Sequence, residues 1–259
     1  ARQLTRIGAQ LFARENLKAA LVGDEAGLKA AQAGFEQTLA RLATGRDDGF
    51  SPPAVTVEPI QKPIFEGWHT STAVSFVAKA FATVPVGHPD APGLALLAKI
   101  MRATYLHREI REKGGAYGGF ALYNPESAVF ALASYRDPHI VQTLAAFEGA
   151  RRFVCDGGFS RQDVDEAVLQ VCADIDKPYP PGEAARKAFV RSVMGLNDEL
   201  RQAFKTQVLA AQQETLTAVA RRYFGPEAGP GAVAVISGEN QLQAANAQLI
   251  EHPLALSKI

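Results

Sequence analysis

The 259-residue chain lacks the features that would place it in several large classes of protein. Its two cysteines, Cys155 and Cys172, are too few for the disulfide framework of a small secreted domain. The 27 basic and 27 acidic residues cancel, so no excess of positive charge favours a nucleic-acid partner. The longest apolar run, residues 72–86, is interrupted by Lys79 and Pro85 and cannot cross a membrane. We therefore expect a cytoplasmic protein, of bacterial origin by its alanine- and arginine-rich composition, with neither a nucleic-acid nor a membrane partner.

The sequence also lacks the common catalytic and metal-binding motifs. No two of its histidines are three to five residues apart, so no helical pair of zinc ligands is present. His107 and Glu109 are two residues apart, which places their side chains on different faces of a helix. There is no nucleophile elbow, Walker A loop or C-x-x-C pair. The glycine-rich run 114–119 follows a helix instead of opening one, so it does not present a helix N-terminus to a phosphate.

Helical and alternating apolar patterns follow one another along the chain. Helical spacing predicts helices over 4–12, 25–43, 92–113, 138–154, 160–176, 182–194 and 197–224. Alternation or short aliphatic runs predict strands over 17–22, 55–60, 69–86, 117–123, 128–135 and 232–236. The sequence therefore predicts an α+β fold, in which an antiparallel sheet carries helices on one face and residues 1–259 form a single domain.

Local signals predict how some of these elements begin, end and face the core. Ser160, with Asp163 three residues later, is close to a capping box at a helix start. Gly114 is predicted to end the helix 92–113. Alternation in the strand 69–86 predicts that its half-buried face carries Val74, Phe76, Ala78 and Ala80.

The stretch REIREKGGAYGGFALYNPES, residues 108–127, places four glycines around a tyrosine directly after a helix. Arg111 falls in the last helical turn and Tyr117 starts the next strand, while Gly118 and Gly119 leave room above that strand for another backbone. The arginine and the tyrosine hydroxyl could then donate to one substrate carbonyl, where each donor to a developing oxyanion contributes about 2.7–4 kcal/mol. Composition alone favours the alternative, in which Arg111 complements the helix dipole and the glycines only form a turn.

The segment YLHREIREKGGAYGGFALYNPESAVFALASYRDP, residues 105–138, resembles the presequence-protease branch of the pitrilysin/insulysin zinc metallopeptidases. The GGAYGG run together with the SYRDP ending carries the resemblance. It extends over most of the chain and includes residues 17–24, the strand around 74–81 and the break at Lys177-Pro178. These peptidases are inverzincins, which bind zinc through an inverted H-x-x-E-H motif.

The resemblance implies a C-terminal domain within a protease of four homologous α+β domains that close around unfolded peptides. In the family, the first domain carries zinc and the catalytic glutamate, and the fourth contributes an arginine and a tyrosine that contact the substrate near the metal. By position in the motif these are Arg111 and Tyr117, with Gly115, Gly118 and Gly119 beside the substrate. The resemblance thus favours the functional interpretation of the pair.

The chain departs from the family pattern because it has no H-x-x-E-H, so zinc would be bound outside it and the chain alone would be inactive. We therefore expect the zinc-less C-terminal domain of a longer metalloendopeptidase that degrades short unstructured peptides; the start within a helical pattern favours this. The alternative is a non-catalytic binding or scaffold subunit of the same fold that partners a separate zinc-bearing chain. A third possibility is an unrelated α+β domain with a purely structural turn, which a buried and internally bonded Tyr117 would favour.

Overall fold

The computed structural model describes residues 2–42 and 63–259. Its internal contacts divide the chain into two compact units, each described here by itself. The first unit comprises residues 1–59 with 178–197, and the second comprises residues 60–177 with 198–259. The predicted strand 55–60 lies outside the described residues.

The described part of the first unit is helical. Its elements are α1 (Arg2–Leu11), a 3-10 helix (Arg14–Asn16), α2 (Glu25–Leu39) and α6 (Pro181–Val193). Asp24 caps α2 by accepting a hydrogen bond from the Gly27 backbone N–H at 2.7 Å. The predicted strand 17–22 was wrong, because the segment pairs with no strand among the described residues and its larger apolar side chains are exposed.

The second unit contains six strands and the other described helices. The strands are β1 (Phe65–His69), β2 (Ser75–Ala82), β3 (Gly118–Asn124), β4 (Val129–Asp137), β5 (Ala232–Ser237) and β6 (Ala255–Lys258). The α-helices are α3 (Ala91–Ile100), α4 (Val141–Cys155), α5 (Arg161–Ile175), α7 (Asp198–Leu209), α8 (Gln213–Phe224) and α9 (Glu239–Asn246). A π-helix, η2 (Met101–Glu112), continues α3, and a 3-10 turn, η3 (Pro226–Ala228), follows α8.

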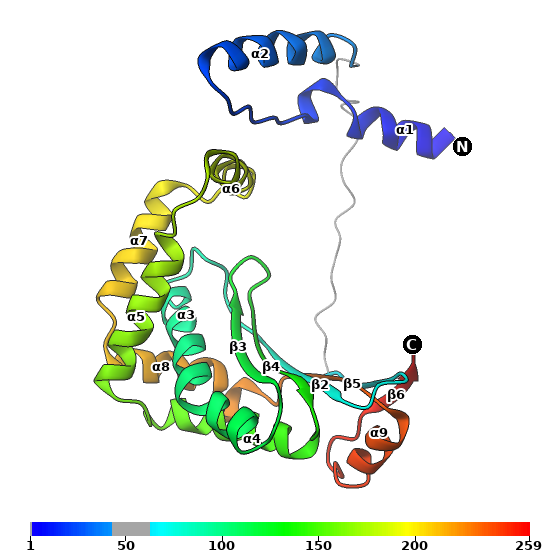
Figure 1. Ribbon diagram of the computed structural model, residues 1–259, viewed down its shortest axis with the longest axis vertical. Helices are drawn as coiled ribbons and strands as arrows, with labels where there is room; N and C mark the ends of the chain where they lie inside the picture. Colours follow the sequence, from blue (N-terminus) through cyan, green and yellow to red (C-terminus); the bar gives the residue numbers. More distant parts are fainter. Residues whose placement is uncertain (1, 43–62) are drawn as a thin grey trace. The chain divides into compact units, whose positions relative to one another are not determined.

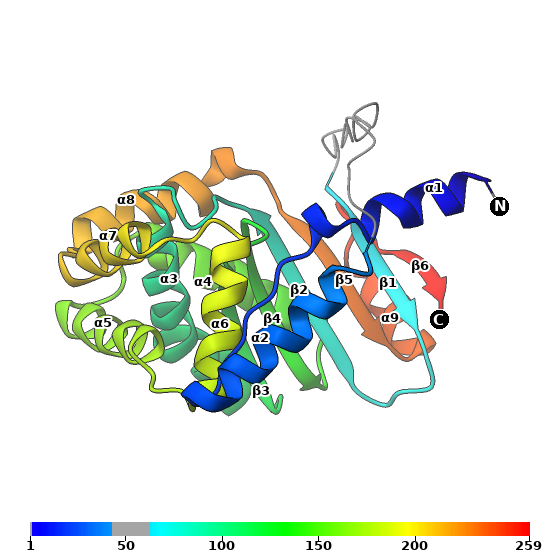
Figure 2. The same ribbon diagram turned by 90° about the horizontal axis from the view of Figure 1, so that it is seen from above.

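The six strands form one sheet in the order β3-β4-β2-β5-β1-β6, which can be followed across Figure 2. The three pairings β3–β4, β4–β2 and β2–β5 are antiparallel, as the sequence predicted. Strand β1 is parallel to both of its neighbours, β5 and β6, so the sheet is mixed. The α+β class is confirmed, although the sequence analysis did not predict β1 or β6.

Helices α3, α4 and α8 pack on one face of the sheet, and α5 and α7 pack outside them (Figure 1). Fully buried residues of the helix layer and of the sheet meet there: Leu94 and Leu97 of α3, Phe147 of α4 and Phe130 of β4. The predicted placement of the helices on one face is therefore confirmed. Burial of this apolar surface is the main stabilising contribution to the unit.

Strand β2 buries the face opposite to the one that the apolar alternation predicted. Its buried residues are Ser75, Val77, Lys79 and Phe81. The Ser75 hydroxyl bonds the Ser237 hydroxyl at 2.8 Å, and the Lys79 ammonium is paired with a carboxylate of α4. The apolar pattern alone predicted the wrong face because both buried polar residues of β2 have polar partners, the buried Ser237 and the partly exposed Glu148.

Helix boundaries follow the local signals only in part, since α2 ends at Leu39 and α4 begins at Val141, whereas the predicted helices were 25–43 and 138–154. The capping box is confirmed, since Ser160 accepts from the Asp163 N–H and the Asp163 carboxylate accepts from the Ser160 N–H at 2.7 Å. The predicted helix 197–224 is two helices, α7 and α8, separated by residues 210–212. The predicted helix 92–113 ends as a π-helix whose C-cap is Lys113, not Gly114.

Candidate functional site

The candidate site lies at the end of η2 and the start of β3, which a short loop connects. In η2 the backbone closes turns five residues apart, as in the bond from the Lys113 N–H to the Arg108 carbonyl at 3.0 Å. Gly115 and Ala116 then donate to the carbonyls of Arg111 and Ile110 at 3.0 and 3.1 Å. The loop is thus folded against the end of the helix. π-Helical segments are rare and often occur at functional sites.

Arg111 is exposed in the last turn of η2. The basic residues next to it are paired with a carboxylate, whereas Arg111 is not paired with one in the described part of the chain. Arg108 and Lys113 both bind Glu109, at 2.9 Å each. The hydrogen bond from Lys113, helped by Arg108, lowers the pKa of Glu109. Among the residues that the structure describes, no carboxylate lies within ion-pairing distance of Arg111. Its Nη1 instead lies 3.2 Å from Nε2 of His107, so its positive charge is not neutralised.

His107 and Glu112 are the residues that the sequence analysis missed at this site. It considered only Glu109 as a partner for His107 and rejected it, whereas Nδ1 of His107 lies 3.2 Å from Oε1 of Glu112. Residues five apart share a side of a π-helix, whereas the sequence analysis assumed α-helical spacing. The only available signal was the combination of a histidine and an acid four residues before and one residue after Arg111.

Tyr117 is 70% exposed, and within the described residues its hydroxyl has no hydrogen-bond partner. Its backbone N–H donates to the carbonyl of Tyr135 at 3.1 Å, which fixes the main chain at the start of β3. The two rings meet edge to face at 5.8 Å, and Tyr135 meets Phe76 in the same way at 5.3 Å. The structure therefore does not favour a buried, internally bonded Tyr117.

The three glycines of the site differ in what surrounds them. Gly115 has φ +74°, a left-handed conformation that other residues adopt at a cost. A Cβ at Gly118 would meet the Phe120 ring at 2.8 Å, whereas a Cβ at Gly119 would meet Leu106 O and Ile110 Cβ of η2, both at 3.1 Å. The space expected above Gly119 is thus occupied by the helix. A substrate contact at these glycines stays a prediction.

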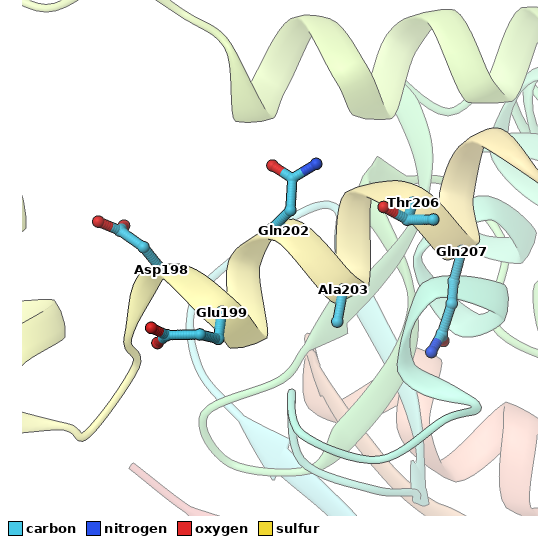
Figure 3. A pocket seen from close by; sticks show the side chains of 6 residues that line it. All are labelled: Asp198, Glu199, Gln202, Ala203, Thr206 and Gln207. Atoms are coloured by element: carbon cyan, nitrogen blue, oxygen red, sulfur yellow. The ribbon is translucent and has the colours of Figure 1, made fainter.

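Two cavities of the second unit are lined by neither Arg111 nor Tyr117. One, of about 660 Å³, follows a single flank of α7, and Figure 3 shows the six side chains that line it, from Asp198 to Gln207. The other, of about 450 Å³, lies between α4 and the segment after α8. Arg151 in its wall donates to Glu148 and to the carbonyls of Phe224, Gly225 and Gly229. Most of its donors are thus occupied by the protein itself.

Metal ligands were not expected in this chain, and residues 2–42 and 63–259 contain no group of three or more histidine, cysteine, aspartate or glutamate side chains that could hold a metal ion. The described residues therefore do not fit a catalytic zinc. In the same part of the chain, no helix is long and apolar enough to cross a membrane.

A family model described as the PreP C-terminal domain matches residues 66–224, more than half of the chain. The chain belongs to the PreP C-terminal domain family. The mitochondrial presequence protease of Danio rerio is 34% identical over 263 residues, covering 93% of this chain and 25% of the relative. That of Mus musculus is 40% identical over 167 residues, covering 64% of this chain and 16% of the relative. The resemblance to the presequence-protease branch is confirmed, and the chain spans a quarter or less of these relatives.

Solved structures share the fold of this PreP C-terminal domain at low identity. A protease from Helicobacter pylori has a TM-score of 0.65 at 17% identity, covering 83% of this chain and 53% of that one. A peptidase M16 inactive domain from Pseudomonas fluorescens has a TM-score of 0.60 at 15% identity, covering 86% and 51%. Identities this low show the fold alone, and the fold is that of peptidase domains, including inactive ones.

Proposed function

We propose that this PreP C-terminal domain is the zinc-less C-terminal domain of a longer zinc metalloendopeptidase that degrades short unstructured peptides. Zinc and the catalytic base would be supplied by residues outside this chain. In the Danio rerio relative, 93% of this chain matches one quarter of a single long protein. This match favours a domain of a longer protease over a separate subunit that partners a zinc-bearing chain. The cytoplasmic location stays a prediction, since the relatives named here are mitochondrial.

One observation carries the proposal: Arg111 and Tyr117 are both exposed, and neither donor group is engaged by a carboxylate or carbonyl of the described residues. They lie at the two ends of one short loop that backbone hydrogen bonds hold against η2 and β4. A peptide carbonyl that gains negative charge during hydrolysis needs donors that are not already used. We infer that the guanidinium and the phenol bind that oxygen and orient the substrate main chain.

The test uses the full-length protein that contains this chain and an unstructured fluorogenic peptide. Arg111→Ala is expected to lower kcat/KM by about 10²–10³, and Tyr117→Phe by a smaller factor. Arg108→Ala is the matched control, because Arg108 is an exposed arginine of the same helix that is already paired with Glu109. It should stay within about twofold of wild type. Values within about twofold for both Arg111→Ala and Tyr117→Phe would overturn the catalytic role, and no cleavage by wild type would overturn the protease assignment.

A further inference from the structure

Two consecutive contacts at the end of η2 connect a carboxylate, an imidazole and a guanidinium. Oε1 of Glu112 lies 3.2 Å from Nδ1 of His107, and Nε2 of His107 lies 3.2 Å from Nη1 of Arg111. The three residues are five and four positions apart, and the π-helix brings them to one side. All three are exposed at the surface, so the contacts are not a by-product of core packing.

The chemistry of the groups fixes the direction of these contacts. A guanidinium carries only donors, so Nε2 of His107 accepts the hydrogen bond from Arg111. The ring is then neutral and carries its proton on Nδ1, the nitrogen that faces Glu112. A carboxylate beside an imidazole N–H orients the ring and makes its other nitrogen a better acceptor.

We propose that His107, held by Glu112, is a positioning residue for Arg111. It fixes one N–H of the guanidinium with a neutral acceptor and leaves the other donors and the full positive charge for a ligand oxygen. Arg108 differs from Arg111, because it binds a carboxylate, that of Glu109, which it shares with Lys113. The ligand oxygen on which this rests is the substrate carbonyl of the proposed function.

Substitutions at His107 in the full-length protein separate its possible roles. His107→Ala is expected to lower kcat/KM about tenfold, mainly in kcat, as for residues within one hydrogen-bond network. His107→Gln should stay within about threefold of wild type, because the amide oxygen can take the place of Nε2 as a neutral acceptor. His107→Glu should lose at least as much as His107→Ala, because its carboxylate binds Arg111 but neutralises it. In the His107→Ala, Arg111→Ala double variant, the loss should not exceed that of Arg111→Ala alone.

The outcomes distinguish this inference from the proposed function. If Arg111→Ala abolishes turnover but His107→Ala and His107→Glu match wild type, the positioning role is wrong and the proposed function stands. If Arg111→Ala itself matches wild type, the proposed function fails at that step. Equal losses for the alanine and glutamine variants would reduce His107 to a structural role.

A measurement on the 259-residue chain tests the geometry without any activity. Nitrogen NMR of the labelled histidines should find His107 as the neutral tautomer with its proton on Nδ1. That signal should change in Glu112→Ala and in Arg111→Ala but not in Arg108→Ala. A proton on Nε2 in the wild-type chain would overturn the arrangement, whatever the kinetics show.

Discussion

Lys79 of strand β2 forms an ion pair with Glu148 of helix α4, although its position in the strand faces the core. Glu148 also binds Arg151, at 2.8 Å. Arg151 in turn donates to main-chain carbonyls between α8 and β5. This network joins the sheet, one helix of the layer above it and the segment that leads back to the sheet.

Removing the shared carboxylate should destabilise the second unit. In Glu148→Ala, the Lys79 ammonium loses its partner, and the Lys79 side chain is only 9% exposed in the wild type. We expect a loss of about 2 kcal/mol in the free energy of unfolding, below the full cost of breaking a buried pair because Glu148 is itself partly exposed. Lys79→Met should cost less, since it removes the charge and keeps the volume. Urea unfolding followed by circular dichroism measures both.

The control for this prediction is Lys99→Met, which breaks the more exposed pair with Asp174. It should change the free energy of unfolding by less than about 1 kcal/mol. Equal values for Glu148→Ala and Lys99→Met would contradict the role given to the buried network.

Alanine at Gly119 and at Gly118 should have different effects on stability. At Gly119 the new methyl group meets the main chain of η2, so the helix must move away from β3, at a cost of about 1–3 kcal/mol. At Gly118 it meets only the end of the Phe120 ring, which can rotate away. Thermal unfolding of the two variants tests this, and identical losses of stability would refute the packing role of Gly119.

The same variants test a substrate contact at Gly118. If Gly118→Ala keeps its stability but raises KM in the full-length protein, that contact is supported.

The capping box of α5 gives a local prediction. Ser160→Ala removes the hydroxyl that accepts from the Asp163 N–H, and it should cost about 1 kcal/mol. Ser160→Thr keeps a hydroxyl and should stay within about 0.5 kcal/mol of wild type. Chemical denaturation compares the two, and a Ser160→Ala variant as stable as the threonine variant would mean that water replaces the cap.

Stability should fall at alkaline pH because of Tyr123. Its hydroxyl donates to the Val84 carbonyl at 2.6 Å, and burial raises its pKa to about 12. A folded-state pKa above the usual value of 10.0 means that the contribution is fully present below about pH 10 and is lost as the pH rises through about 12. The pKa of Tyr223 is raised in the same way, first by burial and then by its bond to Asp90.

Tyr123→Phe isolates the first of these two groups. At neutral pH the variant should be less stable by about 1 kcal/mol, because the hydrogen bond is lost. Between about pH 10 and 12 its stability should fall less steeply than that of wild type. Urea unfolding across this range checks the slopes, and parallel curves would assign the alkaline loss to other groups.

The candidate site was predictable from sequence only in part. The glycine-rich stretch identified Arg111 and Tyr117, and the structure places both at the surface, at the two ends of one short loop. It could not identify His107 and Glu112, because their contact depends on a turn of five residues that no local pattern signalled. It also could not distinguish Gly118 from Gly119, since alternate strand positions face opposite sides and only the packing of η2 shows which side is filled.

The sequence by itself determined the class of the fold, the position of most helices and several of their caps, because periodicity and capping are local properties. It also identified the family, through the GGAYGG and SYRDP segments. Only the tertiary structure decided the parallel placement of β1 beside β5 and β6, the face of β2 that is buried and the neutral partner of Arg111. These three features depend on contacts between residues far apart in the chain or on a rare helical geometry. The interactions that favour them form only when the chain has folded, so no local sequence pattern indicates them.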